Sequence, residues 1–94
     1  HVVRWNGVVC GDEYAELATA AGLDCDREHA PEMLAQRLEV LAVIGGFDTR
    51  LRTAGIEPEE LPSLAADASK QWTGQFNPRP FDEMGALEIY ECAY

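Results

Sequence analysis

Apolar residues in this 94-residue chain recur at spacings of three and four, and strict alternation of apolar and polar residues is almost absent. The first spacing places side chains on one stripe of a helix, whereas a half-buried strand requires the second. The sequence therefore predicts an all-α fold, a small bundle of about five helices in one segment that spans residues 1–94. A chain of this length supports only a thin core, because it buries little more than ~60% of its unfolded surface.

Glycine and proline residues divide the helical pattern. The expected helices cover residues 12–21, ended by Gly22; 31–44, ended by Gly45 and Gly46; one or two turns within 48–55; a helix that opens near Pro58 or Pro62 and ends before Gly74; and 82–94, with Asp82 as the N-cap. The helix over 31–44 is apolar on more than one face, so we expect it to be the central and most buried element.

The chain carries 17 acidic and 7 basic side chains, a formal net charge of -10, and no basic cluster. Phosphate backbones and anionic lipid surfaces repel such a chain, so nucleic-acid and membrane partners are not expected. No apolar run reaches the ~20 residues of a membrane span. An odd number of cysteines (Cys10, Cys25 and Cys92) favours reduced thiols in a cytoplasmic protein. The apolar pair Val2 and Val3 directly follows His1, which suggests a segment of a longer polypeptide.

Residues with catalytic potential are present, but no established motif joins them. A nicotinamide site would need a glycine-rich turn between a strand and a helix, and no such pattern occurs. His1, Cys10, Cys25 and His29 could bind zinc, although their spacing matches no zinc motif. The alternating acids at 24, 26 and 28 resemble a calcium loop that lacks the glycine of its sharp bend. Alone, the chain is expected to bind neither metal nor cofactor and to be non-catalytic.

Five stretches carry a resemblance through their common order and spacing. They are "HVVRWNG" at 1–7, "YAELATAAG" at 14–22, "TRLRTAGIEPEELPSLAADA" at 49–68, "FNPRP" at 76–80 and "ALEIYECAY" at 86–94. Together they resemble the C-terminal part of the iron-containing, or group III metal-dependent, alcohol dehydrogenase family, over essentially the whole chain. The combination of LRxxGI, the following PEEL helix and NPRP is the most specific part of the resemblance.

The resemblance implies a larger parent enzyme with an α/β domain that binds NAD or NADP and a helical domain that holds a divalent metal, usually iron or zinc. The metal ligands of the family lie upstream of this segment, so His1 is not expected to be a ligand. By resemblance, the loop before NPRP approaches the substrate cleft. Trp72, Thr73, Gly74 and Phe76 are the expected cleft-lining residues, and Asn77, Pro78, Arg79 and Pro80 form the expected structural turn, in which Arg79 ties the turn to helix carboxylates or carbonyls.

The resemblance favours a C-terminal helical segment of a metal-dependent NAD(P)-linked enzyme that interconverts an alcohol with an aldehyde or ketone. The alternative is a free-standing acidic helical module that binds a protein partner without catalysis. In the first case the partner is the remainder of the parent enzyme or a second copy of the chain, and a homo-oligomer is expected. An isolated segment should leave apolar surface exposed and aggregate, pair or loosen, whereas a self-sufficient module should unfold cooperatively as a monomer.

Overall fold

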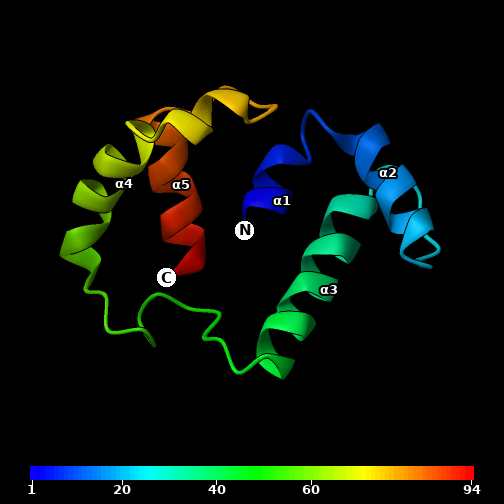
Figure 1. Cartoon of the computed structure of the whole chain (residues 1–94), viewed down its shortest axis with the longest axis horizontal. Coiled ribbons are helices and arrows are strands. Elements are labelled where there is room, and N and C mark those ends of the chain that lie inside the picture. The colour runs from blue at the N-terminus through cyan, green and yellow to red at the C-terminus, as the bar shows by residue number, and fades with distance from the viewer. The chain divides into compact units, whose positions relative to one another are not determined.

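The computed structural model describes all 94 residues, and every regular element is helical (Figure 1). The elements are α1 (Val2–Asn6), α2 (Gly11–Ala20), α3 (Ala30–Ile44), the 3-10 helix η1 (Pro58–Glu60), α4 (Leu61–Ser69), the 3-10 helix η2 (Trp72–Phe76) and α5 (Glu83–Ala93). The predicted all-α fold with about five helices is confirmed. The chain forms two compact units, His1–Phe47 and Asp48–Tyr94.

In the first unit, α1 and α2 both pack against α3. Small side chains allow this approach: Ala18 of α2 and Ala30 and Ala35 of α3 are buried. The approach is closest at Gly7, where a Cβ would lie 2.6 Å from the Cβ of Pro31. Any larger residue at this position would push α1 away from the start of α3.

Both long helices of the first unit end at a glycine in the left-handed region. After α2, Gly22 has φ 72°, and the N–H of Leu23 donates to the carbonyl of Ala18 over 2.8 Å. After α3, Gly46 has φ 75°, and Phe47 donates to Ala42 over 2.9 Å. Both ends are Schellman motifs, in which glycine adopts the positive φ without steric cost. The predicted helix ends at these glycines are therefore confirmed to within one residue.

In the second unit, α4 packs along α5. Leu61 and Ala65 of α4 are buried, as are Gly85 and Ala86 of α5. Asp82 is the N-cap of α5, as predicted, and its carboxylate accepts from the N–H of Gly85 over 2.8 Å. The start of α4 is ordered by η1, which begins with a capping box between Glu57 and Glu60.

Three expectations about the elements are wrong in detail. Residues 48–55 form hydrogen-bonded turns and no helix; Leu51 donates to the carbonyl of Ala93 over 3.0 Å, so this stretch is tied to the end of α5. The helix expected to run to Gly74 ends at Ser69, because Gln71 is extended (ψ 125°), and Trp72 begins a separate 3-10 helix.

The third correction concerns α3, which is not the most buried helix. Its buried residues are the alanines at 30 and 35, while Leu38 is 52% exposed and Ile44 76% exposed. The large apolar residues in the second half of α3 are exposed: Leu38, Val40, Leu41, Val43 and Ile44. No helix of the chain combines the length and apolar character that crossing a membrane requires.

Candidate functional site

The predicted cleft-lining residues lie in η2, the short 3-10 helix after α4. The rings of Trp72 and Phe76 meet edge to face, with centroids 5.7 Å apart and an interplanar angle of 88°. This is a favourable geometry for an aromatic pair, because the positive edge of one ring meets the negative face of the other. Each residue is 70% exposed, so the pair presents aromatic surface outwards.

Gly74, between the two aromatic residues, is where the turn meets Phe81. A Cβ on Gly74 would lie 2.8 Å from Cδ1 of Phe81, so the ring covers the place that a side chain would occupy. Thr73 is exposed beside it. The structure therefore gathers Trp72, Gly74 and Phe76 into one short 3-10 helix, with Phe81 against Gly74.

The residues Asn77, Pro78, Arg79 and Pro80 follow as a turn without regular structure. Asn77 is extended (φ -68°, ψ 134°), as expected before a proline, and its side-chain N–H donates to the carbonyl of Arg79 over 2.6 Å. An Arg79 Nη2 lies 3.7 Å from Oε2 of Glu88 on α5. These contacts attach the turn to the helix that follows it.

The chemistry available in this turn is limited to contact and hydrogen bonding. Between Gln71 and Pro80 the only ionisable side chain is Arg79, which pairs with the carboxylate of Glu88. The turn can bind or orient an uncharged group through its aromatic faces, the Thr73 hydroxyl and its amides. It offers no group for proton transfer. Whether it lines a substrate cleft stays a prediction.

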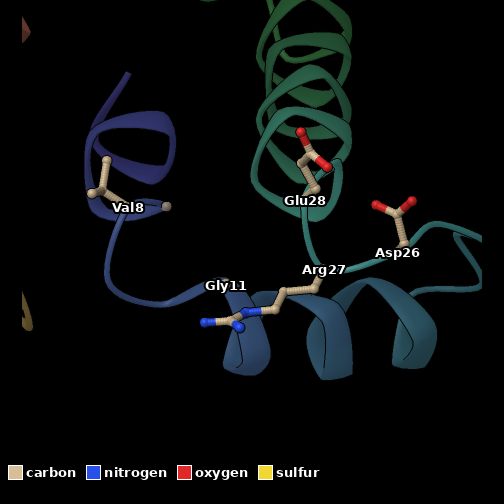
Figure 2. A pocket seen from close by; sticks show the side chains of 6 residues that line it. Val8, Gly11, Asp26, Arg27 and Glu28 are labelled. Carbon is tan, nitrogen blue, oxygen red and sulfur yellow. The ribbon is translucent and has the colours of Figure 1, made fainter.

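An open hollow in the first unit was not foreseen from the sequence (Figure 2). It is lined by Gly7, Val8, Gly11, Asp26, Arg27 and Glu28. Figure 2 shows the Arg27 side chain extending towards Gly11, and Nε of Arg27 lies 2.9 Å from Oδ1 of Asp12. The cation of the hollow is thus already paired with a carboxylate, and the lining contains none of the predicted site residues.

The strongest polar cluster joins α1 to α3. Nε and Nη2 of Arg4 donate to the two carboxylate oxygens of Glu32 over 2.6 and 2.8 Å, and its Nη1 and Nη2 also donate to Glu39. Gln36 donates to Oε1 of Glu32 over 2.9 Å. The hydrogen bond from Arg4 lowers the pKa of Glu32 from 4.5 to about 2, with a smaller contribution from Gln36. The same guanidinium lowers the pKa of Glu39.

Sequence spacing gives no signal for this cluster, because Arg4 lies 28 residues from Glu32 and 35 from Glu39. Its contacts are within the protein, so we interpret it as the clamp that holds the short α1 on α3. Bidentate pairing of an arginine with a carboxylate fixes both distance and orientation.

The four donors weighed as zinc ligands do not form a metal site. No group of three or more His, Cys, Asp or Glu side chains is placed to hold a metal ion. His29 instead pairs with Asp26 at the start of α3. The backbone N–H of His29 donates to Oδ1 of Asp26 over 3.0 Å, and Nδ1 of its ring lies 2.7 Å from the same oxygen. This hydrogen bond raises the pKa of His29 and lowers that of Asp26.

Comparison with known proteins gives one family. The model for the C-terminal part of the Fe-containing alcohol dehydrogenase family matches residues 1–94. The chain is 26% identical to lactaldehyde reductase of Escherichia coli (strain K12) and 27% identical to 1,3-propanediol dehydrogenase of Citrobacter freundii, each over the whole chain and 25% of the relative. The chain thus spans about a quarter of the length of these relatives. No solved structure gives a significant match.

Proposed function

Because the chain belongs to the iron-containing alcohol dehydrogenase family, we propose that it is the C-terminal helical segment of a metal-dependent, NAD(P)-linked alcohol dehydrogenase or reductase. Such an enzyme interconverts an alcohol with an aldehyde or ketone. The observation that carries the proposal is the family match over every residue of the chain, from the RWN stretch near its start to the NPRP turn and the last helix.

The distribution of apolar surface supports a segment that depends on further chain. Thirteen large apolar residues are exposed, and no large side chain is fully buried. Exposed apolar surface on this scale is typical of an interface that another part of a protein covers. We therefore propose the remainder of the parent enzyme as the main partner, with a homo-oligomer as the working assembly.

In this proposal, the binding sites for the metal and the cofactor lie in the remainder of the parent enzyme. The donor set of the segment does not fit a metal ion, and no glycine-rich turn is available for a dinucleotide. The segment contributes a wall of the substrate cleft through Trp72, Thr73, Gly74 and Phe76. The three cysteines are unpaired, which supports a reducing cytoplasmic location.

The reading frame upstream of His1 provides the decisive test. We expect it to encode a nucleotide-binding domain and an aspartate and histidine cluster, and we expect the complete product to reduce NAD(P)+ with an alcohol. A reading frame that starts at or near His1 would refute the proposal that this chain is part of an enzyme, and it would favour the acidic protein-binding module.

A second measurement tests whether the metal and the cofactor bind outside this segment. Thermal unfolding of the 94-residue chain should not shift when NAD(P)H, zinc or ferrous iron is added, whereas the complete enzyme should be stabilised by its ligands. A clear shift of the short chain would contradict the assignment of both sites to the remainder of the parent.

A further inference from the structure

The second half of α3 carries a concentrated apolar surface. Six of the thirteen exposed large apolar residues of the chain lie within residues 38–47. Four of them, Leu38, Val40, Leu41 and Ile44, neighbour one another on the helix at spacings of three or four, and we call them the α3 face. We propose that the α3 face is the docking surface for the polypeptide upstream of this segment, an inference that rests on the proposed function.

The chemistry of this surface is purely apolar. Residues 40–47 read VLAVIGGF and contain no charged or hydrogen-bonding side chain, although 26% of the whole chain is charged. A helix that faces water on one side normally carries polar residues on that side. The end of α3 therefore suits burial against an apolar helix or sheet and offers no group that could pair with a charged partner.

The end of the helix is ordered within the segment. The N–H of Phe47 donates to the carbonyl of Ala42 over 2.9 Å, and Gly46 has φ 75°. The Phe47 ring lies against Gly45, where a Cβ would be 3.0 Å from Cδ2 and Cε2. Because the backbone at this end is already capped, docking on the α3 face requires little further ordering of the helix.

The upstream polypeptide is the occupant that the comparisons favour. The matching family model is that of the C-terminal part, and the chain covers 25% of its relatives, so about three quarters of a parent of that length would precede His1.

A second copy is the less suitable occupant. It would bring another net charge of -10, and two such copies repel each other. Separate chains form a stable interface with roughly 20–30 residues a side, far more than the four residues of the α3 face. Segments of one polypeptide dock with fewer contacts, because their covalent connection gives a high effective concentration.

The test places one substitution in two proteins, the 94-residue chain and the complete enzyme encoded by the full reading frame. Ile44 is 76% exposed in the chain, so Ile44→Ala should change the folded-to-unfolded ratio of the chain by less than about 3-fold in urea unfolding. In the complete enzyme the upstream polypeptide covers this side chain. The same substitution then leaves a cavity and should lower the ratio by about 30-fold or more.

Two further variants calibrate the comparison. Leu61→Ala is the matched control, because Leu61 is only 6% exposed within the chain and should lower the ratio in both proteins. Ile44→Val removes one methyl group and should lower the ratio about 2- to 12-fold in the complete enzyme alone. This milder variant decides the question if Ile44→Ala does not fold in the complete enzyme.

The outcomes separate the docking from the proposed function. If the complete enzyme oxidises alcohols but Ile44→Ala has the same small effect in both proteins, the docking alone is overturned. If a second copy covers the α3 face, Leu41→Asp will split the oligomer of the complete enzyme in sedimentation and leave a stable monomer, which also overturns it. A complete protein that oxidises no alcohol refutes the proposed function, while its unfolding still decides the docking. A reading frame that starts at or near His1 overturns both.

Discussion

Replacing Arg4 with methionine tests the clamp between α1 and α3. Methionine keeps an unbranched apolar stem and a comparable helix propensity, so Arg4→Met removes the guanidinium with little other change. The variant loses the bidentate contact with Glu32 and both hydrogen bonds to Glu39. Two carboxylates then remain on one side of α3 without their counter-charge.

The magnitude follows from the pKa of Glu32. A fall from 4.5 to about 2 corresponds to at most about 3.4 kcal/mol at 1.36 kcal/mol per pH unit. The Glu32 side chain is 49% exposed, so solvent screens the pair strongly. We therefore expect Arg4→Met to lower the free energy of unfolding by about 1–2 kcal/mol at pH 7.

The pH dependence carries a defined sign. Because the pKa of Glu32 is lower in the folded than in the unfolded chain, its pairing stabilises the fold above pH 4.5. This contribution disappears as the pH falls from 4.5 to about 2. Urea unfolding followed by circular dichroism at pH 7, 5, 4, 3 and 2 should show the wild type and Arg4→Met converging over this range.

Arg37→Met is the matched control, because Arg37 is an exposed arginine on α3, the helix that carries Glu32 and Glu39, and it forms none of the ion pairs of Arg4. It should unfold like the wild type within about 0.5 kcal/mol. Equal stability of Arg4→Met and Arg37→Met at pH 7 would refute the clamp. A stability difference between wild type and Arg4→Met that stayed constant down to pH 2 would refute its electrostatic origin.

Three further predictions concern single contacts. Gly7→Ala should destabilise the chain by about 1–3 kcal/mol despite the better helix former, because the new methyl group overlaps α3; thermal unfolding unchanged from wild type would contradict this. Asp82→Ala should cost about 0.5–2 kcal/mol by removing the acceptor of the Gly85 N–H, while Asp82→Asn should retain most of the stability, and equal losses in both variants would argue against capping. The imidazole of His29 should titrate by NMR above its ordinary pKa of 6.5 and return towards it in Asp26→Asn; an unchanged titration would exclude the pair.

The sequence predicted the helices well where local signals define them. Gly22 and Gly46 end helices because glycine adopts a positive φ without steric cost. Asp82 begins a helix because its carboxylate caps the N-terminus. The prediction failed where tertiary contacts decide. Residues 48–55 have a composition that is compatible with a helix, yet the backbone N–H of Leu51 donates to the carbonyl of Ala93 at the end of α5. The predicted apolar stripe ran as far as Trp72, but the backbone of Gln71 is extended and separates Trp72 from α4.

The candidate site was predictable only in part. The sequence predicted the aromatic residues as cleft lining, which stays a prediction, and the structure adds how Trp72 and Phe76 meet and that Phe81 packs against Gly74. The Arg4 clamp was missed because its acidic partners are distant in sequence and look like ordinary solvent-exposed charges of a helix. The burial of α3 was overestimated. Apolar periodicity indicates which side chains can be buried, but it does not show which neighbouring element would bury them.

The composition of the core explains why this segment relies on specific contacts. Five of its seven buried apolar residues are alanines, and each contributes about one methyl group of burial, roughly 0.8 kcal/mol. Fully covering any one of the exposed large residues contributes about 1.5–3 kcal/mol, several times as much. If the remainder of a parent enzyme covers these residues, as we propose, that packing outweighs the core of the segment itself. Within the first unit, the Arg4 clamp and the two Schellman ends then hold the helices in the arrangement that this packing requires.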